Sequence, residues 1–272
     1  MTAAVPAMTA PVPARTAPVL EVRGLSKHFG GVQANADIEL AVAAREIHAL
    51  IGPNGAGKTT LVAQLAGMLA PDTGSIAFEG RQIQALAAHQ RVRAGLARSF
   101  QITSIFRRFS VLENLALAVQ ARSGTSLSFW RPRHEDTAIF EEARELAQDV
   151  GLADREEELA GALAHGEQRQ LEVGLALATC PRLLLLDEPM AGLGPEESER
   201  MIALLAALKG QIAMLLVEHD MDAVFRLADR ISVLVAGRII ATGTPQAIRA
   251  DAAVRAAYLG DAESAQSGPR SR

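Results

Sequence analysis

Residues 46–60 place a glycine-rich loop between a short apolar run and a helical pattern, and few folds contain this arrangement. The run from Glu46 to Ile51 has the composition of a buried strand. Residues 52–59 read Gly-Pro-Asn-Gly-Ala-Gly-Lys-Thr and fit the pattern G-x-x-x-x-G-K-[ST]. Apolar residues then follow at helical spacing, at Leu61, Leu65, Met68 and Leu69. A chance glycine turn before a core helix is the alternative, but strand, loop and helix together predict a phosphate-binding loop.

The residue types of this loop suit the phosphates of a nucleotide. Glycine adopts backbone conformations that a Cβ atom forbids, and the backbone N–H groups then converge at a helix N-terminus, which attracts anions. Lys58 can reach the terminal phosphates, and the Thr59 hydroxyl can ligate Mg²⁺. We therefore expect phosphate contacts from Gly52, Pro53, Asn54, Gly55, Ala56, Gly57, Lys58, Thr59 and Thr60.

Composition and charge exclude several classes of protein. The chain has 272 residues, 49% of them apolar, which suits one large domain or one domain with a subdomain. The net charge of −4 does not favour nucleic acid or an anionic membrane surface as a partner. The single cysteine, Cys180, rules out a disulfide framework and fits a reducing compartment. No apolar run approaches the ~18 residues of a membrane span.

The two ends of the chain differ in composition from the part between them. Residues 1–18 are rich in Ala, Pro and Thr and lack the basic and apolar regions of a signal peptide, which predicts a disordered arm. Residues 261–272 are small and polar, which predicts a loose tail. We expect one folded unit over residues 19–260.

The stretch before residue 102 combines predicted strands with the loop. From Val32 to Val42 apolar and polar residues alternate, which is typical of a half-buried strand in an antiparallel sheet. The other predicted elements are strands at 20–25 and 75–78, a turn at 27–31, a helix at 87–98, and a strand running into a loop at 98–101.

Residues 106–177 have a mainly helical pattern, which predicts an inserted helical subdomain at about 102–177. Ser110 is a candidate N-cap, because Glu113 follows three residues later and the two form a capping box. Residues 137–150 have an amphipathic pattern and predict a second helix.

The second half alternates predicted strands and helices. Four leucines at 183–186 predict a buried parallel strand, which ends in Asp187 and Glu188. Successive residues at a strand end point to different sides, so one acid can hold Mg²⁺ while the other orients or deprotonates the attacking water. We assign Asp187 to the metal and Glu188 to the water. Further predicted elements are a helix from Pro195, a strand at 212–217, a helical stripe at 221–228 and a hairpin of 231–235 with 238–241.

The order of these motifs resembles that of the ATP-binding subunits of ABC transporters, over about residues 20–260. The shared series is the phosphate loop, Gln101 after Phe100, the segment 163–170, the pair Asp187-Glu188, and His219. The resemblance implies an α/β fold, namely a P-loop NTPase core with a small antiparallel β-subdomain and an inserted helical subdomain. In finer detail the chain is similar to the branched-chain amino acid uptake subfamily at residues 95–101, 187–193, 217–221 and 257–260.

The resemblance also implies roles for single residues, with ATP and Mg²⁺ as cofactors. Phe29 would stack its ring on the adenine, although a core Phe beside a glycine turn is an alternative. Gln101 would contact Mg²⁺ and sense the attacking water. His219 would contact the γ-phosphate and hold Glu188 in place, whereas a lone histidine after a strand is otherwise structural. The implied catalytic set is Gln101, Glu188 and His219.

The signature segment of the family, usually Leu-Ser-Gly-Gly-Gln, reads Leu163-Ala164-His165-Gly166-Glu167 here. In the family this segment completes the phosphate site of a second subunit, so we expect nucleotide contacts from Ala164, His165, Gly166 and Glu167. Ala164 has no hydroxyl to donate, whereas the N-terminus of the helix after Gly166 can still offer N–H groups to an anion. A second departure is Gly194, where relatives often carry Asp or Asn.

The resemblance further implies partners and a location. The expected partners are a second ABC ATPase subunit, identical or not, transmembrane permease subunits and, indirectly, a substrate-binding protein, with no nucleic acid. The expected place is the cytoplasmic face of the inner membrane, with Ile102 to Phe109 as the candidate docking surface for the permease. The expected function is the ATPase motor of an importer for branched-chain or related amino acids.

Two other functions stay open at this point. One is the motor of a lipid or glycolipid exporter, which has the same fold. The other is a soluble ABC ATPase that acts on ribosomes or DNA, against which the single cassette and the net charge of −4 argue.

Overall fold

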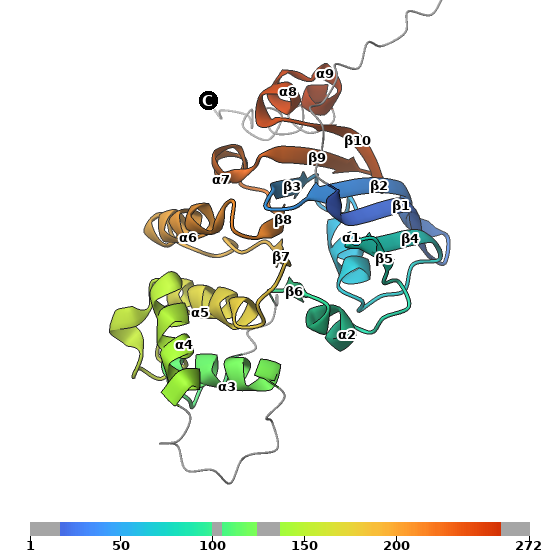
Figure 1. Ribbon diagram of the computed structural model, residues 1–272. Helices are drawn as coiled ribbons and strands as arrows, with labels where there is room; N and C mark the ends of the chain where they lie inside the picture. The colour runs from blue at the N-terminus through green and yellow to red at the C-terminus, as the bar shows by residue number, and fades with distance from the viewer. Residues whose placement is uncertain (1–16, 100–104, 124–136, 257–272) are drawn as a thin grey trace, which may run out of the picture.

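The computed structural model describes residues 17–99, 105–123 and 137–256, and they form two sheets with helices on both sides (Figure 1). The four-stranded sheet has the order β2-β1-β4-β5, and the six-stranded sheet has the order β10-β9-β3-β8-β7-β6. The predicted arm at 1–18, apart from its last two residues, lies outside the described residues, as does the predicted tail at 261–272.

The four-stranded sheet is antiparallel, as the alternating sequence predicted. Along β2 the buried side chains recur at every second residue from Ala36 to Val42, because one face of the sheet packs on the core. The predicted turn at 27–31 is wrong for its first three residues, since β1 continues to Phe29 and pairs it with Val32. The strands of this sheet are β1 (Pro18–Phe29), β2 (Val32–Ala43), β4 (Thr73–Phe78) and β5 (Arg81–Gln82).

The six-stranded sheet is parallel except for its edge strand β10, which is antiparallel to β9. Every residue of the central strands β3, β7 and β8 is buried, which explains why their sequences are apolar except for His48 and Asp187. The predicted hairpin near the C-terminus is confirmed as β9 with β10. The strands are β3 (Ile47–Ile51), β6 (Leu96–Arg98), β7 (Leu183–Asp187), β8 (Ala213–Val217), β9 (Arg230–Val235) and β10 (Arg238–Gly243).

Strand β7 serves two hydrophobic cores, because successive side chains of a strand point to opposite faces. Leu183 and Leu185 pack with helix α1 (Lys58–Leu65) and the antiparallel sheet. Leu184 and Leu186 pack on the other side with α5 (His165–Leu177) and α6 (Pro195–Leu208). Helix α1 therefore lies between the two sheets, as Figure 1 shows.

Two predicted helices are shorter than their patterns suggested. Helix α1 ends at Leu65, before Gly67 with its positive φ of 76°, so Met68 is not a core position of that helix and is 60% exposed. Helix α2 spans only Ala88–Arg93, and residues 96–98 instead form β6. The hydrogen-bonded pairing of β6 with β7 overrides the helical tendency there, after a turn at Gly95 with φ 101°.

Helices α3 (Val111–Ser123), α4 (Thr137–Asp149) and α5 pack together on one side of the parallel sheet. The predicted capping box at the start of α3 is confirmed. The Ser110 N–H donates to Glu113 Oε2 at 2.9 Å, and the Glu113 N–H donates to Ser110 Oγ at 3.1 Å. A 3-10 turn at Ala153–Arg155 lies between α4 and α5.

The C-terminal part adds three short helices. Asp220 is the N-cap of helix α7 (Met221–Leu227). Its carboxylate accepts the N–H groups of Asp222 and Ala223. Helices α8 (Pro245–Ala250) and α9 (Ala252–Val254), whose N-caps are Thr244 and Asp251, were not predicted from the sequence. Within the described ranges, none of the helices has both the length and the apolar character needed to cross a bilayer.

Candidate functional site

The phosphate loop connects the end of β3 to the start of α1, as predicted, and neighbouring backbone lies close to two of its glycines, Gly52 and Gly57. Gly57 has φ 103°, and a Cβ atom there would lie 2.2 Å from the carbonyl oxygen of Ala34 on β2. A Cβ atom on Gly52 would lie 2.0 Å from the carbonyl oxygen of Leu234 on β9. Gly55 has φ 78° and open space around it, so only its backbone conformation favours glycine.

The side chain of Lys58 folds back over the first residues of the phosphate loop. Its Nζ donates to the carbonyl oxygens of Gly52 at 2.7 Å and Pro53 at 3.1 Å, and the side chain is buried. Burial lowers the pKa of Lys58, while the charges of Glu188 and Asp187 act in the opposite direction. The ammonium group is therefore within electrostatic reach of both carboxylates. Thr59 is exposed and Thr60 half-buried in the first turn of α1.

Asp187 is buried at the end of β7 and forms an ion pair with Arg98. Arg98 Nη2 donates to Asp187 Oδ2 at 2.7 Å, and the two side chains are 11% and 1% exposed. Burial raises the pKa of Asp187, and Arg98 opposes this rise. No role was predicted for Arg98 from the sequence, because only the pairing of β6 beside β7 brings it to this position. A positive charge held against an acidic strand end is visible only once the strand order is known.

Glu188 has φ 51°, the left-handed region that side chains other than glycine rarely adopt. Its N–H donates to the carbonyl oxygen of Val217 at 2.9 Å, which holds the turn against β8. Strained backbone of this kind costs about 1–3 kcal/mol and is concentrated at active sites. The turn therefore holds Glu188 directly after Asp187 at the carboxyl end of β7, and its catalytic role stays a prediction.

Glu218, at the end of β8, holds the segment that follows Glu188 through a hydrogen bond to the backbone of Met190. Its side chain is fully buried and accepts the N–H groups of Met190 at 2.9 Å and His219 at 3.1 Å. Burial raises the pKa of Glu218, while these backbone donors lower it. No role was predicted for Glu218, which lies in the stretch 217–221 that resembles the branched-chain subfamily.

His219 follows at the carboxyl end of β8, with its side chain 60% exposed. Its Nδ1 lies 3.7 Å from Glu218 Oε2. Among the described residues no hydrogen bond joins His219 to Glu188, so their expected contact stays a prediction.

The segment at 164–167 forms the N-terminus of α5 and is joined to the N-terminus of α6. Glu197 accepts the Gly166 N–H through Oε1 and the Gly194 N–H through Oε2, each at 3.0 Å. These two donors lower the pKa of Glu197. The Ala164 N–H is likewise bound, by Glu167 Oε2 at 3.0 Å. The Gly166 N–H that we expected to offer to an anion is thus already held by a carboxylate of the same chain.

Phe29 is not a core residue, which excludes the structural alternative for it. It is 51% exposed at the end of β1, with Lys27 Nζ 5.7 Å from its ring centroid. Its expected stacking on adenine stays a prediction. Gln101 and Phe100, like the residues 257–260, lie outside the described residues.

Comparisons with known proteins agree with this geometry. The family model described as ABC transporter matches residues 36–191, more than half of the chain. A second model, described as branched-chain amino acid ATP-binding cassette transporter, matches residues 238–264.

Relatives are similar over nearly their whole length. The high-affinity branched-chain amino acid transport ATP-binding protein BraF of Pseudomonas aeruginosa is 39% identical over 251 residues, covering 90% of this chain and 98% of that protein. The lipopolysaccharide export system ATP-binding protein LptB of Haemophilus influenzae is 33% identical over 244 residues, covering 89% and 98%. A crystal structure of an ABC transporter ATP-binding cassette in its ADP conformation superposes with a TM-score of 0.79 at 27% identity, covering 90% of this chain and all of that one.

The loop, the acidic strand end and the fold are those expected from the sequence, and the relatives match the chain over about nine-tenths of its length. The predicted P-loop NTPase core with an antiparallel sheet and added helices is confirmed. The chain belongs to the ABC transporter family, as an ATP-binding subunit that hydrolyses ATP.

Proposed function

We propose that this chain is the motor subunit of an importer for branched-chain or related amino acids, held by permease subunits at the cytoplasmic face of the inner membrane. The observation that carries the proposal is the 39% identity to BraF over 98% of that protein. The match of residues 238–264 to the branched-chain model supports the same substrate class. An exporter motor is the second candidate, because the lipopolysaccharide export protein LptB is 33% identical.

The residues of the site fit a nucleotide with Mg²⁺. Thr59 and Asp187 offer the hydroxyl and carboxylate oxygens that Mg²⁺ prefers, and Mg²⁺ usually takes only one or two protein ligands beside phosphate oxygens and water. Bound there, Mg²⁺ would neutralise charge that develops on the phosphate oxygens. The described residues contain no group of three or more His, Cys, Asp or Glu that could hold a metal by itself. A site of this kind needs the nucleotide to complete it.

Catalysis then divides among the chain's own side chains. Lys58 and the loop N–H groups bind the phosphates and fix their position. Glu188, held in its strained conformation, orients the attacking water and accepts its proton. His219 contacts the γ-phosphate from the end of β8, and the ring of Phe29 stacks on the base. Gln101 reports the state of the nucleotide to the permease.

The working unit is a dimer of cassettes, the second being identical or different. The segment at 164–167 lies at the start of α5, which packs with the other helices, whereas the phosphate loop follows β3 and leads into α1. We propose that each segment completes the nucleotide site of the other subunit. The link through Glu197 then makes α5 and α6 move together when the dimer opens or closes.

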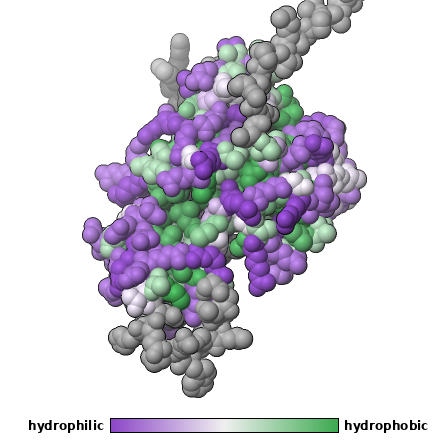
Figure 2. Space-filling view, viewed as in Figure 1, coloured by the Kyte–Doolittle hydropathy of each residue, from purple (hydrophilic) through white to green (hydrophobic). Residues whose placement is uncertain are grey.

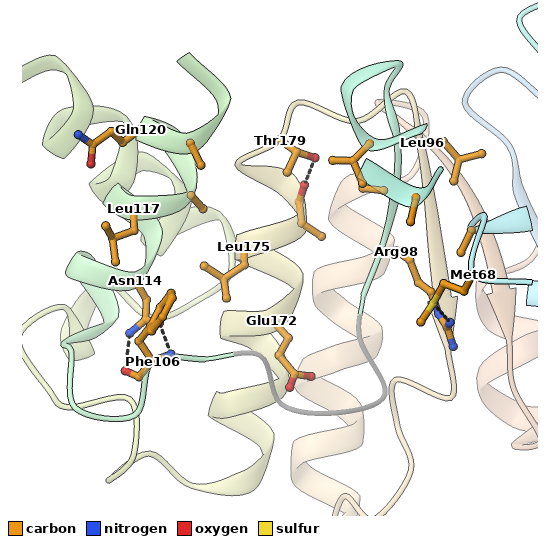
Figure 3. A pocket seen from close by; sticks show the side chains of 17 residues that line it. Met68, Leu96, Arg98, Phe106, Asn114, Leu117, Gln120, Glu172, Leu175 and Thr179 are labelled. Atoms are coloured by element: carbon orange, nitrogen blue, oxygen red, sulfur yellow. Dashed lines mark hydrogen bonds between the residues drawn. The ribbon is translucent and has the colours of Figure 1, made fainter. Parts of the chain in front are cut away.

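The permease docks beside α3, where a cavity of about 450 Å³ opens between the helices and β6 (Figure 3). Of the expected docking segment Ile102–Phe109, residues 102–104 lie outside the described part. Phe106 lines the cavity and is 59% exposed, and its ring stacks on that of Phe109 at 5.6 Å. Asn114 fixes this stretch, because its side chain bonds both the N–H and the carbonyl oxygen of Phe106. Figure 2 shows further hydrophobic residues exposed through the middle of one face, between hydrophilic margins.

The proposal is tested with the complete transporter, purified from native membranes with this chain tagged and reconstituted in vesicles. We expect ATP-driven uptake of leucine in the presence of the binding protein, and no uptake with Glu188→Gln, which should still bind ATP. Phe106→Glu should abolish uptake and leave the ATPase activity of the isolated chain unchanged. Outward transport of a lipid would establish the exporter instead, and the absence of any permease would refute both.

A further inference from the structure

Asn35 is buried, although the sequence pattern of β2 predicts that it faces outward. In the alternating stretch from Val32 to Val42 it occupies one of the polar positions. In the structure its exposed fraction is 0%. Buried polar side chains are hydrogen-bonded with few exceptions, so the position of Asn35 calls for a partner inside the molecule.

A β-bulge in β2 moves Asn35 to the core face of the antiparallel sheet. Leu25 of β1 pairs with Ile38 of β2. Lys27, two residues further along β1, pairs with Asn35, which lies three residues back along β2. The extra residue of β2 forms the bulge, in which Asp37 has a φ of 54°. Because paired residues share a face and Ile38 is buried in the core, the bulge brings Asn35 to the core face as well.

On this face the amide of Asn35 joins helix α1 to the phosphate loop. Its Nδ2 donates to the carbonyl oxygen of Gly57 at 3.2 Å, and its Oδ1 accepts from Gln64 Nε2 at 2.7 Å. The Gly57 carbonyl can only accept a hydrogen bond, so it must face the nitrogen of the amide. A Cβ atom on Gly57 would lie 2.7 Å from Asn35 Nδ2, so the amide fits against the loop only because residue 57 is glycine.

A second contact holds the residue before Gly57. Gly237, in the turn between β9 and β10, donates its N–H to the carbonyl oxygen of Ala56 at 2.9 Å. The carbonyl oxygen of Gly237 in turn accepts the N–H of Ala36 on β2 at 2.8 Å. Strand β2 therefore holds the last two residues of the loop before α1, one directly and one through Gly237.

The two bonded carbonyl groups determine where two N–H groups point. A peptide unit is planar and trans, so its N–H points away from its C=O. The bond to the Ala56 carbonyl therefore orients the N–H of Gly57, and the bond to the Gly57 carbonyl orients the N–H of Lys58. Both N–H groups lie at the start of α1, where they have no acceptor within the helix and suit an anion.

We propose that Asn35 is a positioning residue for the phosphates of ATP, because its bond to Gly57 keeps the phosphate loop in the conformation that binds them. A loop that is already ordered loses less conformational entropy when the ligand binds, so the affinity is higher. The inference concerns ATP binding alone and does not depend on which molecule the transporter carries.

The test compares ATP with tripolyphosphate, which has the phosphates but no base, as ligands of the full chain in isothermal titration calorimetry with Mg²⁺. Asn35→Leu removes both bonds of the amide at similar size. Asn35→Asp keeps an acceptor for Gln64 and removes only the donor to Gly57. We expect each variant to bind both ligands about fivefold more weakly, which corresponds to the loss of one hydrogen bond.

Ser232→Ala is the matched control, because it also removes a buried hydrogen bond of a fully buried side chain. The Ser232 hydroxyl is bonded to that of Thr242 at 2.7 Å and to His48, and none of the three residues belongs to the phosphate loop. We expect this variant to unfold at lower urea concentration than the wild type and to bind both ligands with unchanged affinity.

Binding is measured under conditions in which each variant is folded, so that lower stability alone does not change the affinity. Wild-type affinity of the Asn35 variants for tripolyphosphate overturns the inference, and either variant alone decides this. A loss for ATP without a loss for tripolyphosphate also overturns it, because the effect would then concern the base. An equal loss in Ser232→Ala would assign the effect to general loosening of the fold and overturn it too.

Discussion

Replacing Arg98 by alanine should destabilise the folded chain strongly, and the size of the loss follows from the burial of its partner. Asp187 is 1% exposed at its side chain, and Arg98 is the cation that pairs with it at 2.7 Å. Without Arg98, Asp187 either stays ionised in a poorly solvated site or takes up a proton. Removing one partner of a buried ion pair typically costs about 3–5 kcal/mol. We expect a loss at the lower end, about 3 kcal/mol, because Lys58 also acts on Asp187.

The loss should depend on pH in a defined direction. Burial already raises the pKa of Asp187, and removal of Arg98 raises it further. A carboxyl group with a raised pKa in the folded state favours folding at low pH, and this contribution is lost as the pH rises through that pKa. The difference in unfolding free energy between wild type and Arg98→Ala should therefore shrink as the pH falls through the raised pKa of Asp187 in the variant.

Urea unfolding followed by circular dichroism measures both effects, without nucleotide or Mg²⁺. With an m-value of about 2–3 kcal/mol/M, a loss of about 3 kcal/mol lowers the unfolding midpoint by about 1–1.5 M. Arg226→Ala is the control, because Arg226 binds Glu199 through two bonds of 2.6 and 2.8 Å but at an exposed site. We expect little change there, since solvent replaces the lost partner. A wild-type midpoint for Arg98→Ala at neutral pH, or a deficit that grows as the pH falls, refutes this reasoning.

Three further predictions concern the loop and the helix starts. Gly57→Ala should lower the free energy of unfolding by about 2–4 kcal/mol, because a Cβ atom disfavours its left-handed backbone and would meet the carbonyl oxygen of Ala34. Gly55→Ala should lower it by only about 1–2 kcal/mol, because only the backbone conformation is disfavoured there. Equal midpoints of the two variants in urea would contradict this steric explanation. Ser110→Ala should cost about 1 kcal/mol through loss of the N-cap, measured by the same unfolding; no change would show that the cap contributes nothing. Glu197→Ala should speed hydrogen exchange at the amide of Gly166, and unchanged protection would show that Glu197 does not hold it.

Motifs formed by consecutive residues were predictable because their geometry is local. The loop at 52–59 and the acidic end of β7 lie where expected. The capping box needs only four consecutive residues, and both of its hydrogen bonds are present. The predictions were wrong where a local conformational tendency competes with pairing to a strand that is distant in the sequence. Residues 96–98 continue a helical pattern but pair with β7, and residues 27–29 have turn composition but pair with β2.

What the sequence determined by itself was the chemistry at the end of each strand: a phosphate loop after β3, two carboxylates after β7 and a histidine after β8. The tertiary structure decided how these groups are held. Arg98 and Asp187 are 89 residues apart, Glu218 and Met190 are 28 apart, and Gly166 and Glu197 are 31 apart. Composition and periodicity specify which face of an element is buried, but not which element packs beside it. The order β8-β7-β6 and the packing of α5 on α6 bring these partners together, so their contacts exist only in the folded chain.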